Sequence, residues 1–354
     1  MKENVKELIS RIAFDLGFHA VGITSANDIP TSEEHFLSWR DLGYAADMNY
    51  LLREDPINAK PKRILNEAKS IITLLVNYYT KPPENPGPDY GRVAAYAVGQ
   101  DYHTVLKNKI NLFQEKLKKE FGNHFISKGF SDSVPLLEKS FSRNAGLGFM
   151  GKHTLIINKP SGSYFFICEI ISNLDIEAEA EKEGTCGKCT RCIDVCPTEA
   201  LTVGASSDSP LLDSRLCISY LTIENRGSIE NNLRKKIGNW IFGCDLCQEV
   251  CPYNKKIVET DWEEFKPISG MGHYLRLKDI LSIESDKEFK SKFGNTAIMR
   301  TKRKGLIRNA CIVAGNNKSE ECLPELINLS KDENDLIIKE HALWALERFN
   351  VLKV

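Results

Sequence analysis

The fold of this chain is decided by residues 186–197, which read CGKCTRCIDVCP. The spacing Cys-x2-Cys-x2-Cys-x3-Cys-Pro is typical of bacterial ferredoxins, in which three thiolates bind one iron–sulfur cluster and the fourth binds a second cluster. A further set follows at Cys244, Cys247 and Cys251, which a proline also succeeds, and Cys217 lies between the two sets. These eight cysteines predict two [4Fe–4S] clusters.

The cross-over of the fourth cysteine divides the eight ligands into two groups. The first group is Cys186, Cys189, Cys192 and Cys251, and the second group is Cys196, Cys217, Cys244 and Cys247. Two four-cysteine zinc sites are the alternative, because zinc also binds Cys-x2-Cys pairs, although zinc ribbons rarely show this triple spacing before a Cys-Pro. The remaining cysteines lie in apolar stretches and are expected to be buried; they are Cys168, Cys311 and Cys322.

The composition is that of a folded protein with more than one domain. The chain has 354 residues, 42% of them apolar, with 47 basic and 48 acidic side chains. Hydrophobic cores stop growing at about 250–300 residues, so two or three domains are expected. A net charge of −1 gives no global attraction for a polyanion. The clustered cysteines, the absence of a secretory signal and the lack of an apolar run of about 20 residues predict a cytoplasmic protein outside the membrane.

The apolar pattern predicts an α/β unit before the cysteine region and a helical tail after it. Helices are expected at residues 5–16 and 102–121, strands at 20–23, 70–79, 154–158 and 164–171, and a loop at 81–89. Acidic residues between 177 and 183 mark a boundary near residue 176, and three short helices at the end resemble a HEAT-type repeat. The expected divisions are residues 1–175, 176–260, a connecting segment at 261–300, and the tail at 301–354.

A glycine turn at residues 146–152, GLGFMGK, has the letters of a nucleotide-binding motif. Such motifs need a strand before the turn and a helix after it, whereas here a helical stretch precedes the turn and a strand-like stretch follows. We therefore expect no nucleotide there. Two clusters without a nucleotide site move electrons, so the protein is either an electron carrier or holds another cofactor in its N-terminal domain.

Several segments together resemble the epoxyqueuosine reductase family. They are the double cysteine motif, CISYLTIENRG at 217–227, GCDLCQEVCPY at 243–253, DYH at 101–103, DSVP at 132–135 and the glycine turn. The resemblance covers nearly the whole chain and implies a cobalamin-dependent enzyme that reduces epoxyqueuosine to queuosine at the wobble position of tRNA. It implies an α+β fold with a nitroreductase-like cobalamin domain, a two-cluster ferredoxin module and a HEAT-like tail.

The resemblance also assigns residues. By position, Asp132 matches the family's proton donor near the cobalt. From the residues alone, an Asp-Ser pair with a proline just before an apolar-periodic segment is typical of a helix N-terminus, so helix capping is the alternative for Asp132. The other positions that the resemblance places at the cobalamin are Lys60, Lys152, Ser219, Tyr220 and Asp245. Solvated lysines are the alternative for the first two of these.

One segment is strongly basic: residues 298–308 contain five basic side chains and no acidic one. The basic residues are Arg300, Lys302, Arg303, Lys304 and Arg308, and Asn309 follows them. Together with the resemblance, this segment is expected to bind the phosphates of the anticodon stem-loop, while the pocket recognises the splayed base. A solvated helix face is the alternative.

Two other classes of protein share parts of this pattern. A cobalamin-dependent reductive dehalogenase would use the same cofactors on a small electrophile, but such enzymes typically carry a twin-arginine signal, which this N-terminus lacks. A non-enzymatic two-cluster electron carrier is the second alternative. For the enzyme, the expected partners are tRNA and an external one-electron donor such as a flavodoxin or a ferredoxin, and a monomer is expected.

Overall fold

A four-stranded antiparallel sheet, ordered β1-β2-β7-β4, organises the N-terminal half of the chain. The computed structural model describes residues 4–52, 59–203 and 210–349. The strands are β1 (Ala20–Ser25), β2 (Ser70–Asn77), β4 (Ser127–Phe130) and β7 (Phe165–Ser172). Every residue of β2 is buried, because both faces of this strand are covered.

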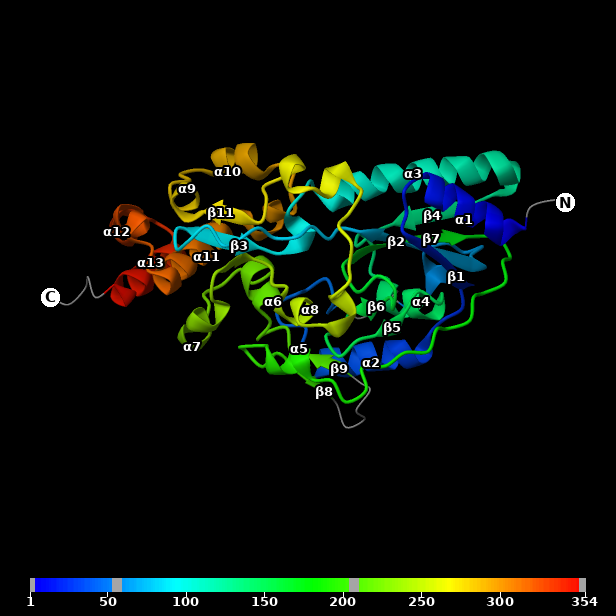
Figure 1. Cartoon of the computed structure of the whole chain (residues 1–354), viewed down its shortest axis with the longest axis horizontal. Coiled ribbons are helices and arrows are strands. Elements are labelled where there is room, and N and C mark those ends of the chain that lie inside the picture. The colour runs from blue at the N-terminus through cyan, green and yellow to red at the C-terminus, as the bar shows by residue number, and fades with distance from the viewer. Residues whose placement is uncertain (1–3, 53–58, 204–209, 350–354) are drawn as a thin grey trace.

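Helices cover the sheet on its two faces. On one face lie α1 (Val5–Asp15) and the long α3 (Tyr102–Phe121), and on the other lies α4 (Glu138–Asn144) (Figure 1). Alternation along β2 divides the core: Ile72 and Leu74 pack with α1 and α3, whereas Leu75 packs with the end of α4. Thr73 shares the face of Leu75, and so does Glu169, its cross-strand partner on β7. The side chain of Glu169 therefore points toward α4.

Most of the elements that the sequence predicts before residue 175 are present. Besides the elements already described, the structure has in this half α2 (Pro30–Asp41), β3 (Tyr90–Val93), β5 (Phe149–Met150) and β6 (Ile156–Ile157). The strand expected at 154–158 is reduced to β6, because Thr154 has a positive φ of 64° and ends the extended segment. The glycine turn follows α4 and itself contains β5, the first strand of the β5–β6 hairpin, so it does not have the strand–turn–helix order of a nucleotide site.

Short elements make up the cysteine region. They are α5 (Arg191–Asp194), β8 (Leu201–Val203), β9 (Pro210–Leu212), α6 (Ile218–Ile223), α7 (Asn231–Arg234), β10 (Trp240–Phe242) and α8 (Leu246–Glu249). Helices α5 and α8, each of which carries a cysteine of one motif, pack against each other. The two cysteine motifs therefore lie side by side.

Helices dominate the C-terminal part. It contains β11 (Tyr274–Arg276), α9 (Leu277–Leu281), α10 (Asp286–Phe293), α11 (Lys302–Asn317), α12 (Leu323–Asp332) and α13 (Leu336–Arg348). The three helices predicted for the tail are α11, α12 and α13, and α13 packs against both others. The segment 261–300 is more than a connection, because it supplies β11, α9 and α10.

A second sheet, ordered β10-β3-β11, joins parts of the chain that the sequence divides. Its strands come from residues 1–175, 176–260 and 261–300, so the expected boundaries are not breaks in the packing. The N-terminal sheet and the C-terminal helices lie at opposite ends of the molecule, with the cysteine region between and beside them (Figure 1). Among the described residues, no helix has the length and apolar character needed to cross a membrane.

Candidate active site

A cavity of about 780 Å³ brings together residues from distant parts of the chain. Asp132 lies on its wall, Cys217 and Tyr220 belong to α6 and its N-cap, and Arg300 comes from the segment before α11. Further aromatic surface is contributed by Trp39 and by the tyrosines that surround Asp132. The cavity thus unites a candidate acid, a candidate cluster ligand and a basic side chain, each of which the sequence predicts separately.

Asp132 is held at this cavity by named contacts. The Tyr102 hydroxyl donates to Asp132 Oδ2 at 2.6 Å, and His103 Nε2 lies 3.8 Å from the same oxygen. The Asp132 N–H donates to Glu138 Oε1 at 2.8 Å. Helix α4 begins at Glu138 with Leu137 as its N-cap, and Asp132 has a φ of 51° outside the helix. The helix-capping interpretation of Asp132 is therefore wrong.

The neighbours of Asp132 are arranged to hold a proton. Asp101 caps α3, and its carboxylate lies 2.8 Å from Nδ1 of His103. This hydrogen bond raises the pKa of His103 and favours the imidazolium beside Asp132. Burial, followed by the charge of Asp132, raises the pKa of Tyr102, so its hydroxyl stays protonated as a donor. Asp132 is thus bordered by two groups that can carry a proton.

The thiols of the predicted first group lie near one another. Burial raises the pKa of Cys192 to about 11, and the neighbouring charges of Cys186 and Cys189 add to the rise. Burial also raises the pKa of Cys251, and the same two neighbours contribute. Cys186 and Cys189 therefore lie within electrostatic reach of both Cys192 and Cys251, although Cys251 is far from the others in sequence. The backbone N–H of Lys152 donates to the Cys186 sulfur at 3.4 Å.

The second group is assembled in the same way. Burial raises the pKa of Cys244, with the charges of Cys217 and Cys247 among the further causes. Burial raises the pKa of Cys217 as well, and Cys196 contributes. Backbone N–H groups after Cys217 and Cys244 point at their sulfurs and favour the thiolates that an iron–sulfur cluster needs. The charge of Cys192 is among the causes that raise the pKa of Cys247, so the two groups are adjacent.

The other three cysteines are buried, as the sequence predicts: Cys168, Cys311 and Cys322. A zinc site would require ligands about 2.3 Å from one ion. Within the part of the chain that the structure describes, no three His, Cys, Asp or Glu side chains converge on such a point.

The predicted cobalamin residues fall into two sets. Ser219 and Tyr220 line the cavity next to Cys217. Lys60 instead forms an ion pair with Glu33 at 2.8 Å. The side chain of Lys152 donates to the carbonyls of Gly187 and Cys189, so it supports the loop of the first cysteine group. The final member of the set, Asp245, accepts a hydrogen bond from the Ala95 N–H at 2.7 Å and lines a second cavity of about 290 Å³.

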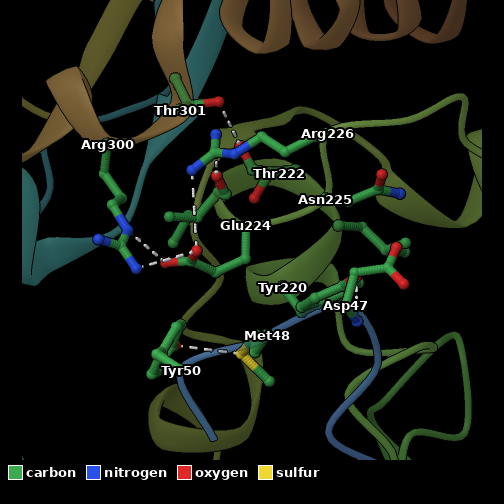
Figure 2. Close-up of polar contacts among 12 residues, drawn as sticks. Asp47, Met48, Tyr50, Tyr220, Thr222, Glu224, Asn225, Arg226, Arg300 and Thr301 are labelled. Atoms are coloured by element: carbon green, nitrogen blue, oxygen red, sulfur yellow. Dashed lines mark hydrogen bonds and ion pairs between the residues drawn. The ribbon is translucent and has the colours of Figure 1, made fainter. Parts of the chain in front are cut away.

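Two arginines share one carboxylate at the large cavity. Arg300 donates to both oxygens of Glu224, at 2.7 and 3.1 Å, and Arg226 lies 3.7 Å from the same carboxylate. Figure 2 shows the two guanidinium groups approaching Glu224 from different directions. Arg300 also lies over the ring of Tyr50, 5.6 Å from its centroid. Two cations and one anion leave a net positive charge at this wall.

Arg308 and Asn309 are buried, with at most 1% of either residue exposed, so the expectation that they bind RNA is wrong. Arg308 donates to the backbone carbonyls of Leu221, Asn225 and Gly227. The amide of Asn309 donates to the carbonyls of Thr222 and Ile241. Both side chains point inward from α11 and fix the end of α6 and the loop after it, which carries Glu224 and Arg226.

The rest of the basic segment does not form one patch. Arg303 pairs with Glu333 at 3.4 Å, and Lys304 pairs with Asp335 at 3.0 Å. Both acidic residues lie about 30 residues after the basic segment in sequence, and the packing of α12 and α13 brings them next to it in space. Lys302 is exposed, and Arg300 faces the cavity.

Sequence reasoning did not single out four side chains of the site. Tyr102 and Glu138 flank Asp132, and Glu224 and Arg226 shape the opposite wall. Three of them lie in segments that the sequence analysis singles out: Tyr102 belongs to the DYH segment, and Glu224 and Arg226 belong to the stretch after Cys217. Only the folded chain shows that these segments meet at one cavity.

Comparison with known proteins identifies the relatives of this chain. The family model described as "Epoxyqueuosine reductase QueG, DUF1730" matches residues 59–133, and the "4Fe-4S double cluster binding domain" matches residues 185–254. An epoxyqueuosine reductase of Leadbetterella byssophila is 37% identical over 88% of this chain and 99% of its own length.

Solved structures agree with the sequence relatives. A crystal structure of epoxyqueuosine reductase with an epoxyqueuosine-modified tRNA-Tyr stem loop is similar with a TM-score of 0.88 and 31% identity, over 97% of this chain and 90% of that one. A Bacillus subtilis epoxyqueuosine reductase, whose catalytic aspartate loop is swung out of the active site, gives a TM-score of 0.87 and 30% identity over the same shares. This chain thus belongs to the epoxyqueuosine reductase family of oxidoreductases and contains a double [4Fe–4S] cluster-binding domain.

Proposed function

We propose that this chain reduces epoxyqueuosine to queuosine in tRNA with the help of cobalamin and two [4Fe–4S] clusters. The observation that carries the proposal is one cavity with the carboxyl group of Asp132 on its wall and Cys217, a member of the second cysteine group, also lining it. Conversion of an epoxide to an alkene consumes two electrons and two protons and releases water. The cavity therefore needs a reductant and a proton source, and both kinds of residue meet there.

The eight cysteines hold the clusters in the two groups described above. The second group is the one beside the cavity, because Cys217 lines it. The cysteines of the first group do not line the cavity. When bound, the clusters supply one-electron transfer between the cavity and an external donor, which we propose to be a flavodoxin or a ferredoxin.

The walls of the cavity and the residues next to it support cobalamin as the cofactor. Aromatic side chains with a few polar groups form its walls, which suits one face of a corrin ring. Ser219 and Tyr220 hold the cofactor in this proposal, and Lys60, Lys152 and Asp245 act outside the cavity. When bound, cobalamin supplies a strongly reducing metal centre beside the substrate.

Asp132 delivers a proton to the epoxide oxygen. Its carboxyl group is 67% exposed, at the cavity, and Tyr102 orients it. His103 is positioned to return a proton to it. The relative from B. subtilis supports a mobile loop at this position, since its own catalytic aspartate loop has been seen outside the active site.

Arg300 binds a phosphate of the RNA at the cavity, and the exposed Lys302 contributes charge. When Arg300 turns to the phosphate, Arg226 keeps Glu224 paired, because it already lies 3.7 Å away. Tyr50 offers a ring on which a base can stack. The relative solved with a tRNA stem loop supports RNA as the partner.

The finer features of the fold remain part of this proposal. They are the nitroreductase-like character of the N-terminal domain, the HEAT-like pairing of α11, α12 and α13, a monomeric state and a cytoplasmic location. The packing of α13 against α11 and α12 supports the helical repeat.

The decisive experiment is an anaerobic reconstitution with iron, sulfide and cobalamin, followed by incubation with a reductant and an epoxyqueuosine-containing anticodon stem-loop. Mass spectrometry should show loss of one oxygen from the modified base, and Asp132→Asn should bind cobalamin but turn over slowly. Bound cofactors without conversion, together with reduction of a small halogenated compound, would favour the dehalogenase-like alternative. A protein that takes up iron but no cobalamin would favour the electron carrier.

A further inference from the structure

Glu138 contacts the backbone of Asp132, the proposed proton donor, on the side away from the cavity. Its Oε1 accepts a hydrogen bond from the backbone N–H of Asp132 at 2.8 Å, whereas the Asp132 carboxyl group lines the cavity. Glu138 itself is not part of the cavity lining. It therefore acts on the substrate only through Asp132.

The backbone at this contact needs support. Asp132 has a φ of 51°, in the left-handed region, which is uncommon for non-glycine residues although aspartate adopts it more readily than most. Such a conformation persists only where surrounding contacts hold it in place. The contact of the Asp132 N–H with Glu138 fixes residue 132 from the backbone side, and Tyr102 holds its side chain.

The surroundings of Glu138 favour its neutral form. Burial raises the pKa of Glu138 to about 8, the negative charge of Asp132 adds to the rise, and the hydrogen bond from Asp132 and the charge of Lys139 oppose it by less. From β7, the fully buried Glu169 faces the same space; burial, followed by the charge of Glu138, raises the pKa of Glu169 well above its ordinary value. Strands β1, β2, β5 and β6 also pack against α4 and present no charged residue within their bounds. The other titratable groups near Glu138 are Cys168 of β7 and Tyr102 of α3; burial raises the pKa of each, so both stay uncharged.

We propose that Glu138 is a positioning residue that latches the Asp132 loop to the start of α4 while its carboxyl group carries a proton, and that loss of this proton loosens the loop. This inference rests on the proposed role of Asp132. A neutral carboxyl group accepts the Asp132 N–H without opposing the nearby carboxylate. An ionised one would accept the N–H more strongly, but it also places a second negative charge beside the Asp132 carboxylate, and this repulsion is the larger of the two effects.

The sign of the pH effect follows from this arrangement. Because the pKa of Glu138 is raised from 4.5 to about 8, its ionisation is disfavoured in the folded protein. The latch is therefore closed near pH 7 and weakens as the pH rises through about 8. Proton delivery by Asp132 should fall over the same range.

The test compares three proteins by hydrogen exchange of the peptide that contains residues 131–137, expressed as protection factors between pH 6.5 and 9. Glu138→Gln keeps the oxygen acceptor but cannot ionise, and Glu138→Ala removes the acceptor. We expect wild-type protection to fall roughly tenfold above pH 8, Glu138→Gln to stay protected, and Glu138→Ala to be unprotected throughout. Glu120→Gln, an exposed change at the end of α3, is the matched control and should behave as wild type.

Turnover gives the second readout. In Glu138→Ala, kcat for the stem-loop should fall while KM for the RNA and cobalamin binding change little, and Glu138→Gln should lose the decline of kcat above pH 8. Lys139→Gln should keep the transition and move it to higher pH, because Lys139 favours ionised Glu138. Wild-type protection in Glu138→Ala, or the same pH dependence in wild type and Glu138→Gln, would overturn the latch. If Asp132→Asn turned over normally, the proposed role of Asp132 would fail, whereas hydrogen exchange would still decide the latch.

Discussion

The eight cysteines and the basic segment at residues 298–308 differ in where their side chains meet. The thiols within each cysteine group influence one another's pKa, because short loops and the α5–α8 contact bring them near one another. The basic side chains diverge, because each step along α11 turns a residue by about 100°. Arg308 points inward, Lys304 meets Asp335, and Arg300, before the helix, faces the cavity. Residue spacing is informative when all members bind one centre, and much less so for charges along a helix.

The largest effect is expected when a shared centre loses a ligand. Cys217→Ser removes one of the four thiols of the second group, so about half of the bound iron should be lost and turnover should disappear. Iron analysis and the electron paramagnetic resonance spectrum of the reduced protein measure this. Cys311→Ala, a change at a buried cysteine outside both groups, should keep its iron. Full iron content in Cys217→Ser would place the ligand elsewhere.

Among the residues of the basic segment, the buried Arg308 should contribute most to the free energy of unfolding. Arg308→Met leaves three backbone carbonyls without their donor, so the free energy of unfolding should fall by about 3 kcal/mol. Urea unfolding measures this, and the exposed Lys302→Met should stay within about 0.5 kcal/mol of wild type. If the two variants lost equal stability, the clamp between α11 and the loop after α6 would not exist.

RNA binding should separate Arg300 from Lys304. Arg300→Gln is expected to reduce the slope of log affinity against log salt concentration by about 0.7–0.9, because one phosphate contact is lost. Lys304→Gln should keep the wild-type slope, since Lys304 is already paired with Asp335 outside the cavity. Fluorescence anisotropy with a labelled stem-loop at several salt concentrations is the measurement. The opposite ranking would restore the basic segment as one continuous RNA surface.

The smallest effect is expected for Lys152, and it concerns how firmly the first cysteine group holds its iron. Its ammonium group holds the loop of the first cysteine group through Gly187 and Cys189. Lys152→Met should release iron to a chelator roughly threefold faster and leave cobalamin affinity unchanged. Normal iron release with weaker cobalamin binding would instead support the position at the cobalamin that the family resemblance suggests.

Local pattern was sufficient for much of the fold. The helix expected at residues 102–121 is α3 with the same bounds, because its apolar period matches one buried face. Local pattern was insufficient where contacts between segments distant in sequence determine the structure. The segment 261–300 appeared to be a connection, but β11 completes a sheet with β3, which precedes it by more than 170 residues. At the site, Asp132 resembled a helix cap because sequence spacing does not reveal that α4 begins only at Glu138.

The sequence by itself determined the iron–sulfur chemistry and the main elements, because cysteine spacing and hydrophobic period are local properties, and its resemblance to known sequences indicated the family and cobalamin. Only the tertiary structure decided which charges remain available. Glu224, Glu333 and Asp335 lie far from the basic segment along the chain, and they reach its side chains only after α6, α12 and α13 have packed around α11. Electrostatic energy depends on distance in space and on burial, so the partners of Arg300 and the proton on Glu138 are properties of the folded molecule.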